Sequence, residues 1–406
     1  MKKAIALVVV WSLFSTLLAG CRPGATSPSG IVLGIAREPA PWAPRQRKLA
    51  SLPAYNPKAE FGFQVDLRGF DLSDLDLTGR AYDLLHADFS TATRWPAHLP
   101  EPFDPVAIME LGKNPGLDVR MLHEQGVTGR GVGVAIIDQP LLIGHMEYKD
   151  RLRCYEELGI PKNEQASMHG PAVASIAVGK TVGVAPEADL YYFGVGFGDY
   201  ILGSYWTYVV EAVERILRLN ENLPPDNKIR VISISAGWEK GQVGYERMVR
   251  VVEEAKRRGV FVVASLLQET YGFWFSGAGR DPLADPDQAS SYGAGTHWAG
   301  SLPANADVRS PAHLLVPMDS RGTASPGAVD EYVFYPEGGR SWAIPYLAGL
   351  YALCCQVKPD ITPEAFWNTA LETGTPTVAT YEGTSYPIGM VINPMRIVEA
   401  LESGMR

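Results

Sequence analysis

The chain has 406 residues, of which 46% are apolar and 20% are charged. This balance is that of a globular protein and excludes wholesale disorder, and the length suits one large α/β domain with an N-terminal attachment. The net charge of −9 provides no basic field, so nucleic acid is excluded as a partner.

The first 20 residues have the pattern of a targeting segment: two lysines, an apolar run over residues 4–17, and Leu-Ala-Gly before Cys21. This ending resembles the bacterial lipobox, which implies that residues 1–20 are a signal peptide and that Cys21 is lipidated, for example with palmitate. A transmembrane anchor is the alternative, although the run is short for a span of ~20 residues. Either anchor predicts a protein tethered to the bacterial cell membrane on its extracytoplasmic face.

Two segments separate this anchor from the main domain. Residues 21–59 are rich in Pro, Gly, Ser and Ala, which predicts a flexible spacer. Residues 60–116 form an N-terminal extension in which Asp-Leu pairs recur every five residues, at Asp66, Asp71 and Asp76. This period resembles the pentapeptide repeat, but three copies cannot bury a core by themselves. We therefore expect a short strip packed on the domain that follows, with coincidence as the open alternative.

From residue 117 to residue 406 predicted helices and strands alternate. Helices are predicted at 117–125, from His169 onward, at 206–220 and at 245–258, and strands at 131–138, 189–194, 229–235 and 259–265. This alternation predicts a doubly wound, mostly parallel sheet with helices on both faces. Residues 283–336 are rich in Gly, Pro, Ser and Ala, which predicts irregular surface structure.

Three polar residues occupy positions that suit catalysis. Asp138 ends a buried strand, and catalytic groups gather at the carboxyl edge of such sheets. His169 precedes a helix of small residues. Ser341 lies at the first turn of an apolar helix, where free N–H groups can hold an oxyanion. Taken singly, each is more often a turn former, a core residue or a helix cap.

Taken together, these segments resemble the subtilisin-like serine proteases (subtilases, peptidase family S8). Asp138, His169 and Ser341 follow in that family's order, at separations of 31 and 172 residues. The resemblance covers residues 122–375 and implies the doubly wound subtilisin-like fold. Matching pieces are Gly129-Arg130-Gly131-Val132, His169-Gly170, Gly183-Val184-Ala185-Pro186, Ser235-Ala236-Gly237, Ala343, Pro345 and Thr362-Pro363-Glu364.

The resemblance also implies roles and a function. Ser341 is then the nucleophile, His169 the general base and acid, and Asp138 the group that orients His169, while residues 235–237 (Ser235, Ala236, Gly237) pair with the substrate backbone. The expected protein is a monomeric, membrane-tethered serine endopeptidase that cuts polypeptides through an acyl-enzyme. No cofactor is required. Ca²⁺ is conceivable because many subtilases bind it, but Asp281, Asp285 and Asp287 at their spacing are more often solvated.

Several residues depart from the family pattern. Gln268 stands where the family has the Asn whose amide completes the oxyanion hole, so the hole is expected to consist of the Gln268 amide and the Ser341 backbone N–H. The alternative makes Gln268 a surface loop residue. Leu267 and Trp342 are bulkier than the family's residues. These departures leave open a second function, that of a subtilase-fold pseudoprotease serving as a cell-surface peptide-binding or regulatory module.

The remaining metal-binding residue types provide no further site. Cys154, Cys354 and Cys355 lack metal-ligand spacing, and we expect them to pack as small apolar groups. His145 and Glu147 form too small a set to hold a metal, and a solvated loop is the preferred interpretation.

Overall fold

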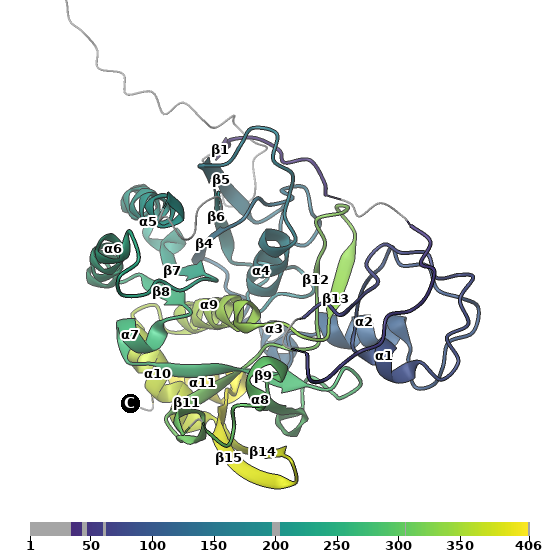
Figure 1. The fold of residues 1–406 in the computed structure, drawn as a ribbon. Coiled ribbons are helices and arrows are strands. Elements are labelled where there is room, and N and C mark those ends of the chain that lie inside the picture. The colour runs from purple at the N-terminus through teal and green to yellow at the C-terminus, as the bar shows by residue number, and fades with distance from the viewer. Residues whose placement is uncertain (1–33, 43–46, 60–61, 197–203, 305, 405–406) are drawn as a thin grey trace, which may run out of the picture.

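The computed structural model describes residues 34–42, 47–59, 62–196, 204–304 and 306–404 (Figure 1). The signal segment and the proposed lipidation site Cys21 lie outside the described residues. Within the described residues, no helix combines the length and the apolar character that a membrane crossing requires.

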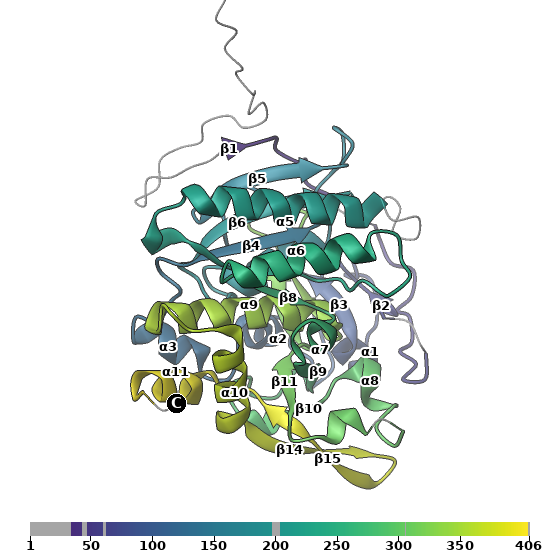
Figure 2. The same ribbon diagram turned by 90° about the vertical axis from the view of Figure 1, so that its left-hand side faces the viewer.

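A six-stranded parallel sheet forms the centre of the molecule, which confirms the predicted fold class. In spatial order its strands are β1 (Gly34–Ile35), β5 (Leu152–Leu158), β6 (Asp189–Val195), β4 (Gly133–Asp138), β7 (Ile229–Ile234) and β8 (Phe261–Ala264). Helices α5 (Ser204–Asn222) and α6 (Tyr245–Arg257) cover one face, and α4 (His169–Val178) and α9 (Arg340–Val357) cover the other (Figures 1 and 2).

Strand β4 shows why a continuous apolar run was the right sequence signal for this sheet. Val134 and Ile136 pack into the hydrophobic cluster on the α4–α9 side, whereas Ala135 and Ile137 pack into the cluster on the α5–α6 side. Because side chains alternate between the two faces and both faces are covered, every position must be apolar.

A second sheet lies below α9 in Figure 1, and two of its strands fall within residues 283–336, which were predicted to be irregular. It has five strands, β10 (Tyr292–Ala294), β9 (Trp274–Arg280), β11 (His313–Pro317), β15 (Thr384–Val391) and β14 (Thr375–Tyr381). The prediction that residues 283–336 are irregular is therefore wrong for β10 and β11. It is also wrong for the hairpin β12 (Arg321–Ala324) and β13 (Tyr332–Tyr335). Strand β11 pairs with β9 and β15, which lie outside this stretch, whereas β12 and β13 pair with each other.

The other helices pack around the sheets. They are α1 (Ala81–Leu85), α2 (Pro105–Lys113), α3 (Val119–Glu124), α7 (Leu267–Tyr271), α8 (Thr296–Ala299), α10 (Pro363–Thr373) and α11 (Pro394–Glu402), with short 3₁₀ turns at Pro225–Asn227, Ala289–Ser291 and Asp307–Arg309. Helix α10 begins as the sequence suggests, because the Thr362 hydroxyl accepts a hydrogen bond from the Ala365 N–H.

The N-terminal extension is a small coil built on the predicted period of five. Each of Asp66, Asp71 and Asp76 closes a turn by accepting a hydrogen bond from the backbone N–H two residues later. The leucines that follow them are buried, at 0 to 2% exposure: Leu67, Leu72 and Leu77. Strands β2 (Val65–Asp66) and β3 (Ala87–Ser90) pair in parallel, and β3 adds to β13. The extension and the hairpin before Ser341 therefore share one sheet.

The prediction of a free spacer over residues 21–59 is wrong for its described part. Strand β1 pairs with β5 and forms the edge of the main sheet. Further along, the Trp42 N–H donates to the Pro326 carbonyl, and the Tyr55 hydroxyl donates to the Glu337 carboxylate at 2.9 Å. The low apolar content misled the prediction because backbone pairing and single side-chain anchors hold this segment in place.

Candidate functional site

Asp138 and His169 meet where β4 ends and α4 begins. Asp138 is the last residue of β4 and only 6% exposed, and His169 is the first residue of α4. The helix start can approach this closely because residue 170 is glycine: a Cβ there would lie 2.6 Å from both the Gln139 carbonyl and the Tyr192 hydroxyl. The result is a hydrogen bond of 2.7 Å between His169 Nδ1 and Asp138 Oδ1.

This pair sets the protonation behaviour of the imidazole. Burial lowers the pKa of His169, but the charge of Asp138 and its hydrogen bond together outweigh burial, so the pKa lies above its ordinary value. With Nδ1–H donated to the carboxylate, the other ring nitrogen, Nε2, is the one left to exchange a proton.

Ser341 is the second residue of α9 and is linked to the end of β7. The Ser235 hydroxyl donates to the Ser341 carbonyl at 3.0 Å, and the Ser341 hydroxyl donates to the Ser235 carbonyl at 3.5 Å. Among the described residues, no hydrogen bond joins His169 to Ser341. The next residue, Trp342, is buried with its ring centroid 5.3 Å from that of His169, so the imidazole lies beside the first turn of α9.

The turn before Ser341 has a support that sequence reasoning missed, Asp319. This carboxylate is buried, with one oxygen accepting from the Gly338 N–H at 2.9 Å. Its other oxygen accepts from the Thr296 N–H at 2.9 Å and from the Thr296 hydroxyl at 3.0 Å. Burial raises the pKa of Asp319 to about 6. No sequence signal distinguishes it, because a single Asp in a Gly- and Pro-rich stretch is usually a turn residue.

Gln268 lies in the short helix α7, with its side chain exposed at the rim of a cavity of about 200 Å³. Arg340, the residue before Ser341, lines the same cavity, and its guanidinium donates to the Ser265 carbonyl at 3.2 Å. Gln268 therefore shares a cavity with the residue that precedes the nucleophile candidate. Among the described residues, its side chain makes no hydrogen bond with Ser341. The preceding Leu267 is fully buried.

The predicted substrate-binding segment follows β7. Ser235, Ala236 and Gly237 are all half-buried. Ala236 already uses both of its backbone groups, since its N–H donates to the Ile234 carbonyl at 2.7 Å and its carbonyl accepts from the Ser265 N–H at 3.0 Å. A peptide that approached this segment would therefore meet, at Ala236, a backbone N–H and a carbonyl that are already paired within the fold.

The weaker metal-binding candidates serve structural roles. Asp281 and Asp285 each close a turn, and Asp287 accepts from the Asn114 amide and the Asp118 N–H. In the described part of the chain, no three His, Cys, Asp or Glu side chains gather as metal ligands would.

Two further expectations can be compared with the structure. The solvated loop expected at His145 and Glu147 is wrong, because both residues are buried, and Glu147 accepts from the backbone N–H and hydroxyl of Thr181. The prediction for the cysteines is confirmed: Cys154, Cys354 and Cys355 are buried, and within the described residues none of them forms a disulfide.

The sequence is similar to known proteins. Residues 129–390 match the model of the subtilase family, Peptidase_S8. Serine protease AprX of Bacillus subtilis (strain 168) is 26% identical over 59% of this chain and 60% of its own. Subtilisin NAT of Bacillus subtilis subsp. natto is 28% identical over 66% of this chain and 65% of its own. The matches thus span 60 to 65% of the length of these curated relatives.

Among solved structures, the prenylagaramide maturation protease PagA aligns with a TM-score of 0.46 and 18% identity, over 70% of this chain and 98% of its own.

Proposed function

The chain belongs to the subtilase family, and from this premise we propose that it is a serine endopeptidase with Asp138, His169 and Ser341 as its catalytic triad. The observation that carries the proposal is the Asp138–His169 hydrogen bond of 2.7 Å beside the first turn of the helix that bears Ser341. The orienting carboxylate thus comes from β4, the base from α4 and the nucleophile candidate from α9, and these three elements pack on one another.

In the proposed reaction, Ser341 Oγ attacks the carbonyl carbon of the scissile peptide bond while His169 Nε2 takes its proton. The Asp138 carboxylate stabilises the imidazolium that forms. The tetrahedral intermediate then collapses to an acyl-enzyme as His169 passes the proton to the leaving amine. Water, deprotonated by the same nitrogen, hydrolyses the ester and restores Ser341.

This chemistry requires one local movement. The Ser341 hydroxyl points to the Ser235 carbonyl at 3.5 Å, which is a weak contact, and it must turn toward His169 before attack. A serine hydroxyl changes direction by rotating about χ1 between staggered positions, with no backbone change. We therefore propose that substrate binding selects the rotamer that faces the imidazole.

The oxyanion that develops during attack needs donors. The backbone N–H of Ser341 lies in the first turn of α9, where no helical carbonyl is available to accept from it. We assign the second donor to the Gln268 amide, which would reach over from the rim of the neighbouring cavity. Removal of such a donor typically costs about 10²- to 10³-fold in turnover, a magnitude measured in a subtilisin.

A fluorophosphonate probe tests the proposal directly, because it reacts only with an activated serine. We expect the folded chain to be labelled at Ser341, and we expect Ser341→Ala and His169→Ala to abolish labelling. Ser73→Ala, which removes an exposed serine outside the site, is the matched control and should retain labelling. A folded protein that resists the probe would refute the proposal.

A pseudoprotease that captures peptides is the second candidate function. The observation that favours it is the Ser341 hydroxyl, which bonds to the Ser235 carbonyl rather than to His169. Stable peptide capture without cleavage, unaffected by Ser341→Ala, would establish this function in place of the first.

We further propose that Cys21 is lipidated and holds the enzyme on the extracytoplasmic face of the bacterial membrane. The support is the lipobox-like sequence that ends at this cysteine. Cys21→Ser should move the protein from the membrane fraction to the soluble fraction, and mass spectrometry should find an acyl group only on the unsubstituted chain. Equal distribution of the two proteins would contradict the proposal.

A further inference from the structure

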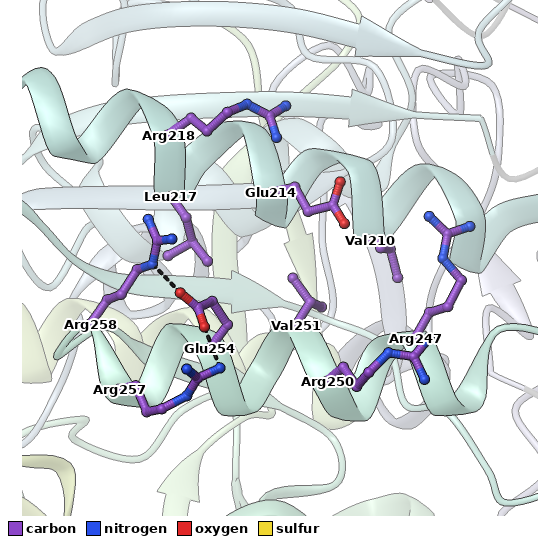
Figure 3. A pocket seen from close by; sticks show the side chains of 10 residues that line it. All are labelled: Val210, Glu214, Leu217, Arg218, Arg247, Arg250, Val251, Glu254, Arg257 and Arg258. Atoms are coloured by element: carbon purple, nitrogen blue, oxygen red, sulfur yellow. Dashed lines mark hydrogen bonds and ion pairs between the residues drawn. The ribbon is translucent and has the colours of Figure 1, made fainter.

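An arginine-lined groove runs between α5 and α6, on the face of the main sheet opposite to α4 and α9 (Figure 3). Its volume is about 340 Å³. Five arginines and two glutamates line it, which gives a formal charge of +3 on a chain whose net charge is −9. The lining residues are Val210, Glu214, Leu217, Arg218, Arg247, Arg250, Val251, Glu254, Arg257 and Arg258. This local reversal of charge marks the groove as a candidate for anion binding.

The groove follows from the helical repeat. On α6, Arg247, Arg250 and Glu254 recur at spacings of three and four residues, which places them along one side of the helix. Buried valine and leucine side chains form the floor between the two helices, and the charged groups stand on either side of it (Figure 3). Because both helices pack on the sheet, the packing holds the backbone atoms from which these side chains extend.

The arginines of the groove differ in how their charges are neutralised. At one end, Glu254 pairs with both Arg257 and Arg258. Arg218 on α5, toward the same end, and Arg247 and Arg250 on α6, toward the other end, form no ion pair with any described residue, and Glu214 lies between them along the groove (Figure 3). Uncompensated like charges in one groove repel one another, so an anion that bridges them gains more than it would at an isolated arginine.

We propose that the groove binds a phosphate-bearing anion through the three arginines without an ion pair, Arg218, Arg247 and Arg250. A guanidinium offers planar pairs of donors that match phosphate oxygens. A phosphate presents oxygens in several directions and can accept hydrogen bonds from arginines of α5 and α6 at once. A carboxylate presents only two oxygens, which lie in one plane. The groove lies on the opposite face of the sheet from α4 and α9, and its ligand binding does not depend on the proposed peptidase activity.

Calorimetric titration of the full chain with inorganic pyrophosphate tests the proposal. We expect saturable binding that weakens at least about tenfold in Arg247→Ala/Arg250→Ala, because several charge-assisted hydrogen bonds are lost. The matched control is Arg47→Ala/Arg396→Ala, which removes the same charge from two exposed arginines outside the groove. The control should bind within about twofold of the unsubstituted chain. No binding, or equal weakening by both double variants, would overturn the proposal.

Two further experiments ask whether the phosphate belongs to a lipid headgroup or to a free compound, and whether the groove prefers a phosphate to an acidic peptide. Vesicles of phosphatidylglycerol should retain more of the chain than phosphatidylcholine vesicles, by an amount that depends on Arg247 and Arg250, if the phosphate belongs to a lipid headgroup. Pyrophosphate binding without that increment would assign a free phosphate compound. Tighter binding of a hexaglutamate peptide than of pyrophosphate would replace the phosphate assignment with an acidic peptide.

Discussion

The buried carboxylate of Asp319 accepts a hydrogen bond from the Gly338 backbone N–H, three residues before Ser341. The same carboxylate holds the N-terminal residue of α8, Thr296, through two further bonds. Asp319 therefore connects the turn that presents the nucleophile candidate to a neighbouring segment of the second sheet. It acts through the turn and is a positioning residue.

Replacing Asp319 by alanine should loosen this turn and destabilise the fold. Three donors in a buried site lose their acceptor, and one unsatisfied buried donor typically costs about 1–3 kcal/mol. We expect Asp319→Ala to lower the free energy of unfolding by at least that amount, measured by urea denaturation. The reduction in kcat should be larger than the change in KM, because the substitution displaces the serine and not the peptide-binding segment. Val316→Ala, in the strand β11 that precedes Asp319, controls for a general packing defect, because Val316 is fully buried and its side chain makes no hydrogen bond.

Asp319 also predicts how stability depends on pH. Its folded-state pKa of about 6 lies above the ordinary value of 3.8, so between these values the folded state binds more protons than the unfolded state. The contribution of Asp319 to stability should therefore fall as pH rises from about 4 to about 6, and then level off. Urea titrations of the natural chain and Asp319→Asn across this interval measure the effect. A difference between them that does not change with pH would contradict it.

The Asp138–His169 pair predicts the pH dependence of peptide cleavage. The base must be neutral, so kcat/KM should fall as the medium is acidified through the pKa of His169. Since Asp138 raises that pKa, the inflection should lie above the ordinary value of 6.5. Asp138→Asn should move the inflection to lower pH and reduce turnover by about 10⁴-fold, as loss of the orienting carboxylate does elsewhere. If the inflection stays at the same pH in Asp138→Asn, Asp138 does not set the pKa of the catalytic base.

Gln268 provides a test of the oxyanion hole. If its amide supplies the second donor, Gln268→Ala should reduce kcat by about 10²- to 10³-fold and leave KM nearly unchanged. Glu269→Ala is the matched control, because Glu269 is equally exposed, follows in the same short helix and lines the same cavity. Equal activity of the two variants would mean that the Ser341 N–H works without Gln268.

The N-terminal coil should unfold together with the peptidase domain. Leu72 is fully buried in a cluster that also contains Phe334 of β13, so the two parts share a core. Leu72→Ala should cost about 2–5 kcal/mol. It should lower the temperature of a single calorimetric transition. Ser73→Ala, at the exposed next position, should change stability by no more than about 0.5 kcal/mol. Two separate transitions would show that the coil folds on its own.

Sequence reasoning succeeded where a residue's own neighbours dictate its structure. The strand that ends at Asp138, the helices that begin at His169 and near Ser341, and the buried leucines at every fifth position all follow local periodicity. The physical reason is that burial on one or both faces imposes an apolar pattern that can be read from a short window. The parallel sheet followed from the alternation of these patterns.

Tertiary structure alone decided the rest. Strands β1, β11 and β13 pair with strands that lie far away in the chain, and no local pattern identifies those partners. The Ser341 hydroxyl meets the Ser235 carbonyl, and Asp319 meets Gly338, only because packed elements bring these groups together. The sequence by itself determined which residues can carry the chemistry. Packing between remote segments decided which of them touch, since such contacts depend on several elements at once and leave no periodic trace along the chain.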